Sequence, residues 1–137
     1  EIAMNVLTYL FFEGNCEEAI EFYRHTLDAQ VDMLMRYQDS PDPEMITAGS
    51  ENKILHAELR IGDTVLMASD NPSSEQSSFQ GFSLSLSPTN AADADRLFNA
   101  LADGGQVQMP LGKTFWSPCF GMVTDRFGVS WMINVPD

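Results

Sequence analysis

Hydrophobic and polar positions follow the same succession of patterns twice along this chain. A short apolar run at 5–12 ends at a Glu-Gly-Asn turn and predicts a buried strand. The stretch at 15–27 is amphipathic with helical spacing, and it begins at Asn15, a residue type that commonly caps helices. After this helix the pattern predicts three more strands, with a polar, proline-containing loop at 38–52 among them. They lie at 30–37, 54–61 and 62–69.

The segment at 54–61 alternates strictly between apolar and polar residues. One side of this strand should therefore carry Ala57, Leu59 and Ile61. The other side should carry the polar residues His56, Glu58 and Arg60. Because the apolar side can pack on a helix, we expect the polar side to face a cleft or solvent.

The second half of the chain repeats this order after a polar linker at 71–79. The segment "GFSLSLS" at 81–87 alternates apolar residues with serine and predicts a half-buried strand. A helix is predicted at 90–105, with Asn90 as its cap and a Gly-Gly pair at its end. The remaining strands are predicted in "QVQMPL", "CFGMVTD" and "VSWMINV".

Individual residues also correspond between the two halves. The matching pairs are Asn15 with Asn90, Ala19 with Ala94, Tyr23 with Phe98, Arg60 with Arg126, Gly62 with Gly128, Thr64 with Ser130, and Leu66 with Met132. A repeated unit of one strand, one helix and three strands indicates two similar βαβββ modules that share a core. We place these modules at 4–70 and 80–137, within a single domain spanning 4–137.

Charge and composition narrow the classes of partner. The 137 residues suit one soluble domain, and 20 acidic against 7 basic residues give a net charge of −13. Such a charge disfavours nucleic acid and anionic membrane surfaces, and no apolar run approaches the roughly 20 residues of a bilayer span. Cys16 and Cys119 fit no metal-binding spacing. With no signal-peptide pattern, we expect free thiols and a cytoplasmic location.

Three stretches resemble the PhnB-like branch of the vicinal oxygen chelate superfamily, which includes glyoxalase I, bleomycin-resistance proteins and extradiol dioxygenases. They are "YLFFEGNCEEAIEFY", "LHAELRIGDTVLMASD" and "FWSPCFGMVTDRFGVSWMINV". The resemblance implies an α+β fold in which the mixed sheets of two βαβββ modules curl around a central cleft, with the helices outside. It also implies a homodimer.

The superfamily's usual divalent metal is held by His, Gln or Glu at four places, in the first and last strand of each module. By resemblance these places look like Thr8, Leu66, Ser83 and Met132 in this chain. Metal-binding members carry Glu four residues after the glycine that opens the final strand, where this chain has Met132. Alkyl, thioether and neutral hydroxyl groups are poor ligands for such cations, so we expect no metal and no other cofactor.

Other polar and aromatic residues leave two interpretations open. His56 and Glu58 share a strand face, where they could bind a metal or exchange a proton, or could form an ordinary polar contact with each other or with Arg60. Trp116 lies with Phe115 and Phe120 near a loop at 112–118. These aromatic side chains could line a cleft for flat apolar ligands, or could pack in the core or a dimer interface.

Two functional hypotheses follow. The first is a metal-independent homodimer that binds an unidentified small molecule. Its candidate cleft residues are Thr8, His56, Glu58, Leu66, Ser83, Ser85, Trp116 and Met132. The alternative is a metal-dependent lyase, isomerase or dioxygenase with a non-standard site built on His56 and Glu58. A ubiquinone-type methyltransferase finds no support, since the chain lacks the glycine-rich strand–loop–helix that seats a nucleotide-like cofactor. The sequence assigns no catalytic residue.

Overall fold

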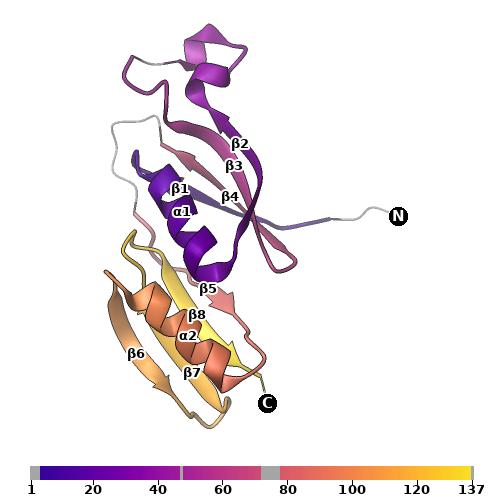
Figure 1. Cartoon of the computed structure of the whole chain (residues 1–137), viewed down its shortest axis with the longest axis vertical. Coiled ribbons are helices and arrows are strands. Elements are labelled where there is room, and N and C mark those ends of the chain that lie inside the picture. The colour runs from indigo at the N-terminus through magenta and orange to yellow at the C-terminus, as the bar shows by residue number, and fades with distance from the viewer. Residues whose placement is uncertain (1–3, 47, 72–77, 137) are drawn as a thin grey trace. The chain divides into compact units, whose positions relative to one another are not determined.

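The chain folds as two compact units, Glu1–Ser77 and Ser78–Asp137. The computed structural model describes residues 4–46, 48–71 and 78–136. Within these residues, each unit has one four-stranded mixed sheet and one α-helix packed against it (Figure 1). The predicted α+β fold with two βαβββ units is confirmed. The proposed linker at 71–79 falls mostly outside the described residues.

The first unit arranges its sheet in the order β1-β4-β3-β2. Its elements are β1 (Thr8–Phe12), α1 (Cys16–Leu27), β2 (Gln30–Arg36), β3 (Ile54–Ile61) and β4 (Thr64–Asp70), with two short 3₁₀ helices at Tyr37–Asp39 and Pro43–Met45. β1 pairs in parallel with β4, whereas β3 is antiparallel to both of its neighbours. A two-residue turn at Gly62, whose φ is +59°, joins β3 to β4 as a tight hairpin.

Helix α1 begins where the sequence predicts, with Asn15 at the N-cap position. The side chain of Asn15, however, makes no capping hydrogen bond. The first helical N–H, that of Cys16, donates instead to Oδ1 of Asp70 at the end of β4, over 3.0 Å. Two acidic residues in the first turn stabilise the helix, because their negative charges lie near the positive end of the helix dipole. The helix start is thus fixed by a carboxylate from the neighbouring strand.

The second unit repeats this plan with sheet order β5-β8-β7-β6. Its elements are β5 (Leu84–Leu86), α2 (Ala91–Ala102), β6 (Gln106–Gly112), β7 (Cys119–Thr124) and β8 (Ser130–Val135). Asn90 caps α2 as predicted, because its Oδ1 accepts the N–H of Asp93 over 2.8 Å. β5 is shorter than the predicted strand at 81–87, since only three of its residues pair with β8.

One side of each sheet is buried against its helix. In the first unit, Leu10, Ala57 and Ala68 are at most 2% exposed and occupy the same side of adjacent strands. In the second unit, Ile133 faces Gly121 across the β7–β8 pair. A Cβ added to Gly121 would lie 2.8 Å from the Phe98 ring of α2, which shows how closely this helix approaches the strand.

No helix in the described ranges is both long enough and apolar enough to cross a bilayer.

Candidate functional site

The side of the first sheet that points away from α1 forms a half-buried surface, which we call the first open face. Tyr9, Met67 and Glu58 form a row across β1, β4 and β3, because Met67 is the register partner of both others. Phe11 and His56 point to the same side two residues further along their strands. This face combines aromatic, thioether and polar side chains.

A hydrogen-bonded Tyr–His–Glu network crosses the first open face. The Tyr9 hydroxyl lies 2.9 Å from Nδ1 of His56, and Nε2 of His56 lies 3.0 Å from Oε2 of Glu58. In the neutral imidazole that fits these partners, Nδ1 accepts the Tyr9 proton and Nε2–H donates to the Glu58 carboxylate. Both imidazole nitrogens are therefore engaged by protein groups, and neither has a free lone pair for a metal.

Tyr9 is the residue of this network that the sequence analysis missed. Its ring stacks on Phe11 with centroids 4.8 Å apart and packs beside His56 at 5.5 Å. The signal was present in the alternation of β1, since Leu10 and Phe12 are buried and their neighbours must point the other way. Arg60, the other contact considered for Glu58, pairs with Asp32 at 3.1 Å.

Thr8 and Leu66 do not lie on the first open face. They are register partners of each other and share the side of Leu10 and Ala68, which packs toward α1. Leu66 is only 5% exposed. Their assignment as cleft residues does not fit this geometry, because strand alternation places both on the side that packs toward α1.

The second sheet has a corresponding surface, the second open face, on the side away from α2. Ser85, Met132 and Met122 form a row across β5, β8 and β7, and Phe120 faces Asn134 in the next row. Another candidate, Ser83, lies on the same side as Ser85, because it contacts Ser130, two residues before Met132 on β8. Its hydroxyl lies 2.7 Å from that of Ser130. Five of the predicted candidates, His56, Glu58, Ser83, Ser85 and Met132, thus lie on open faces.

Trp116 is held at the edge of the second open face by a tight turn. Oγ1 of Thr114 accepts the N–H groups of Trp116 and Ser117 at 3.3 and 3.0 Å. The indole ring, 52% exposed, packs edge-on against Phe120 with centroids 5.4 Å apart. Trp116 therefore borders Phe120, which is itself buried.

Two buried carboxylates stabilise the fold of their own units through hydrogen bonds and do not form part of a ligand site. Asp70 accepts the N–H groups of Cys16 and Ile54 at 3.0 and 2.8 Å, one on each oxygen. Asp125 accepts two backbone N–H groups and the indole N–H of Trp131, the last at 2.9 Å. Burial, reinforced by Asp70 and Glu17, raises the pKa of the Cys16 thiol, which keeps it protonated and unreactive at neutral pH.

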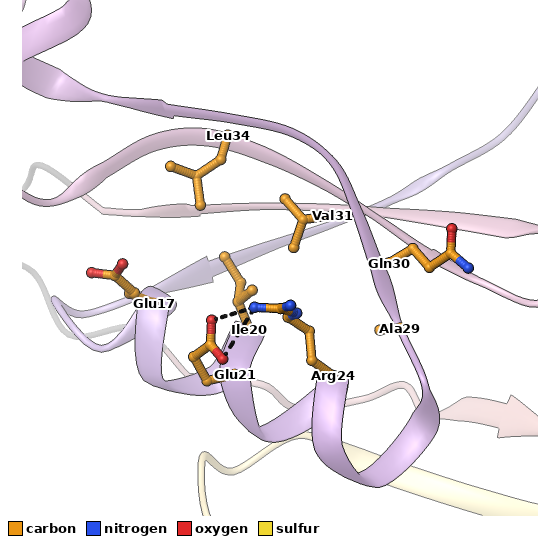
Figure 2. Close-up of a pocket in the computed structure, with 8 residues that line it drawn as sticks. All are labelled: Glu17, Ile20, Glu21, Arg24, Ala29, Gln30, Val31 and Leu34. Atoms are coloured by element: carbon orange, nitrogen blue, oxygen red, sulfur yellow. Dashed lines mark hydrogen bonds and ion pairs between the residues drawn. The ribbon is translucent and has the colours of Figure 1, made fainter.

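A separate hollow of about 400 Å³ lies between α1 and β2 (Figure 2). Its apolar side chains are those of Ile20, Ala29, Val31 and Leu34. Its charged groups are engaged, since Arg24 pairs with Glu21 at 2.9 Å and Glu17 binds Arg36. The hydrogen bond from Arg36 lowers the pKa of Glu17. The hollow therefore has a small apolar surface surrounded by charged side chains that already form ion pairs.

The residues on the open faces do not fit the divalent metal that the resemblance to the vicinal oxygen chelate superfamily implies. Met132 offers only a thioether where metal-binding members have a carboxylate, and the His56 nitrogens are occupied by Tyr9 and Glu58. Across residues 4–46, 48–71 and 78–136, no three His, Cys, Asp or Glu side chains gather as a possible metal site.

The comparisons with known proteins agree with this architecture. A family model described as 3-demethylubiquinone-9 3-methyltransferase matches residues 4–134. Protein PA1353 of Pseudomonas aeruginosa is 47% identical, with a TM-score of 0.88 over 98% of both chains. Protein YjdN of Escherichia coli is 36% identical over 96% of this chain and 95% of its own length.

A PhnB protein from Bacillus cereus is 30% identical, with a TM-score of 0.80 over 96% of this chain and 99% of its own. A glyoxalase/bleomycin resistance protein/dioxygenase domain from Frankia has a TM-score of 0.72 at 13% identity, over 100% of both chains, and shows the fold alone. The chain therefore belongs to the PhnB-like 3-demethylubiquinone-9 3-methyltransferase family. It shares the fold of the glyoxalase/bleomycin resistance/dioxygenase domain.

Proposed function

We propose that this protein binds a small organic molecule on the open faces of its sheets without using a metal ion. The observation that carries the proposal is the engagement of both His56 nitrogens, by Tyr9 at 2.9 Å and by Glu58 at 3.0 Å. A histidine that ligates a metal keeps one ring nitrogen for the ion and orients the other through a carboxylate or carbonyl. Here Glu58 could orient the ring, but Tyr9 occupies the nitrogen that an ion would need.

The composition of the first open face supports a ligand with both apolar and polar parts. Tyr9 and Phe11 offer aromatic surface and Met67 an adaptable thioether, while His56 and Glu58 supply directed polar groups. The chain's net charge of −13 favours a neutral or cationic molecule over a polyanion. We extend the homodimer expected from the superfamily to this chain as part of the proposal.

The metal-dependent alternative would require Tyr9 to leave His56, so that Nδ1 and Glu58 could serve as ligands. Methyl transfer, which the family's description names, would require a seat for a nucleotide-like methyl donor. The glycine-rich strand–loop–helix that commonly forms such a seat does not occur in the sequence. We therefore base the proposal on binding.

Thermal denaturation against a library of small neutral and cationic metabolites tests the proposal. Protein treated with a chelator should gain thermal stability with some compounds, because a ligand that binds only the folded state raises the melting temperature. The same rise should appear with EDTA present throughout. The proposal is wrong if stabilisation appears only after zinc, nickel, manganese or iron is added. Light scattering of the protein as it elutes from a size-exclusion column measures its mass and so tests the homodimer. The mass of a monomer would contradict this part of the proposal.

A further inference from the structure

The second open face contains a buried hydrogen-bond acceptor that lacks a donor. Oδ1 of Asn134, on β8, is inaccessible to solvent and has no hydrogen-bond partner among the residues that the structure describes. It is the only such side-chain atom found in those ranges. Buried polar atoms are nearly always paired, because an unpaired one forfeits its bonds to water. An exception of this kind calls for a specific partner.

The surroundings of Asn134 indicate what sort of partner would fit. Phe120 lies directly across from it in the β7–β8 register, and the Trp116 ring packs on Phe120 at a centroid distance of 5.4 Å. The adjacent row carries the thioethers of Met122 and Met132. One unpaired acceptor thus lies within a surface of aromatic and thioether groups, which favours flat apolar molecules.

We propose that Asn134 is a ligand-binding residue, whose carbonyl oxygen accepts a hydrogen bond from an O–H or N–H group on a flat aromatic ligand packed against Phe120 and Trp116. This inference rests on the proposed function and names its ligand class: neutral phenols, aromatic amides and related donor-bearing rings. Since Oδ1 is buried, the ligand must displace a neighbouring side chain. Trp116 can move most readily, because it lies on a turn and is 52% exposed.

Two probes of matched shape test the donor requirement. 2-Naphthol carries an O–H group, whereas 2-methoxynaphthalene has the same rings without a donor. In NMR titrations of ¹⁵N-labelled protein, 2-naphthol should shift the side-chain signals of Asn134 and Trp116. It should bind at least about ten-fold more tightly than the ether, which corresponds to one good hydrogen bond in a buried site.

The Asn134→Leu variant separates a binding role from a structural one. It should bind both probes with affinities within about two-fold of each other, and its melting temperature should rise, because a buried unpaired oxygen has been removed. A structural asparagine would instead lower the melting temperature when replaced. The Thr124→Val variant is the matched control, since Thr124 lies on β7 and its hydroxyl donates to Gln108 at 2.8 Å. It should keep the preference for 2-naphthol.

Three results would overturn the inference. They are equal affinity for the two probes in the wild type, an unchanged preference in Asn134→Leu, and no shift at Asn134 or Trp116 with either probe. A metabolite that binds without metal but shifts only the first open face would contradict this inference and leave the proposed function standing. A metal requirement for every ligand would refute the proposed function instead.

Discussion

The two open faces are built on the same backbone plan and carry different side chains. Strand register makes their positions correspond pairwise: Tyr9 with Ser85, Glu58 with Met122, Met67 with Met132, His56 with Phe120, and Ser69 with Asn134. In the first unit the polar groups bond to one another as the Tyr–His–Glu network. In the second unit the aromatic and thioether groups surround one unpaired acceptor. The repeat keeps its framework while its two open faces differ in side chains and in hydrogen bonding.

The helix-facing sides differ much less, because packing constrains them. Ala57 and Gly121 occupy corresponding positions and are both buried, and the helix side chains Tyr23 and Phe98 are both large aromatics. A sheet buried against a helix tolerates only side chains that fill the space between them. The open faces escape this constraint, so ligand specificity should reside there.

The largest expected loss of stability comes from removing a framework carboxylate. Asp70→Ala leaves two buried N–H groups without acceptors and should lower the free energy of unfolding by about 3 kcal/mol or more. Asp125→Ala should have a similar effect in the second unit, where three donors lose their acceptor. Urea denaturation measures both. The control is Asp32→Ala, whose exposed pair with Arg60 should contribute less than about 1 kcal/mol. Equal losses for Asp70 and Asp32 would contradict the framework role.

Adding a methyl group at Gly121 or removing one at Ala57 should lower the free energy of unfolding in both cases. Gly121→Ala should lower the free energy of unfolding by about 1–3 kcal/mol, since the new Cβ would meet Phe98 at 2.8 Å and Leu111 at 2.9 Å. Ala57→Gly should cost about 1 kcal/mol through backbone entropy and a small cavity. Chemical denaturation of the two variants measures both losses and compares an overpacked position, Gly121→Ala, with an underpacked one, Ala57→Gly. A stabilised Gly121→Ala would show that α2 lies further from β7.

Alkaline pH should affect the start of α1 but not that of α2. The pKa of Cys16 is raised above its ordinary value of 9.0, first by burial and then by Asp70 and Glu17. The folded state therefore holds the thiol proton more tightly than the unfolded state, and this stabilisation is lost as pH rises above 9. The loss should be about 1 kcal/mol between pH 9 and 10, and the slope should approach about 1.4 kcal/mol per pH unit at higher pH.

The Cys16→Ala variant checks that slope. It should be less stable at pH 7 through lost packing but should lose less stability between pH 9 and 10 than the wild type. Ala91, at the corresponding place in the second unit, has no titrating group. Parallel pH profiles for the wild type and the variant would show that another group controls the alkaline transition.

The smallest expected effects lie on the open faces themselves. Tyr9→Phe removes the hydroxyl bonded to His56 and should lower the free energy of unfolding by about 1 kcal/mol. Ser85→Ala, at the corresponding exposed position, should change it by less than about 0.5 kcal/mol. Chemical denaturation with both variants in parallel measures the difference. If Tyr9→Phe changes the free energy of unfolding as little as Ser85→Ala does, the network does not form in solution.

Local patterns were sufficient to predict the order of elements. Alternation at 54–61 correctly separated Ala57 and Leu59 from His56 and Glu58, because a strand with one buried side records that burial in every second residue. The cap at Asn90 was likewise readable from its own segment. The cap at α1 was not, since its acceptor is Asp70, far away in the sequence.

The match between Leu66 and Met132 explains why Leu66 was assigned to a cleft. The glycines Gly62 and Gly128 align well, but they lie in turns of different length, one between Ile61 and Thr64 and the other between Thr124 and Ser130. A one-residue difference after a turn reverses the side to which every following side chain points. Leu66 consequently faces α1, and Met67 is the residue whose register position in the first sheet corresponds to that of Met132 in the second.

The most direct test of metal-independent binding is the ¹⁵N NMR spectrum of the imidazole rings as Zn²⁺ is added to one equivalent. We predict that the His56 ring signals stay in place, because Tyr9 and Glu58 hold both nitrogens. His25, which is exposed on α1, serves as the internal control for weak, non-specific contact. A shift of a His56 nitrogen that saturates at one equivalent, while His25 is unchanged, would contradict the account.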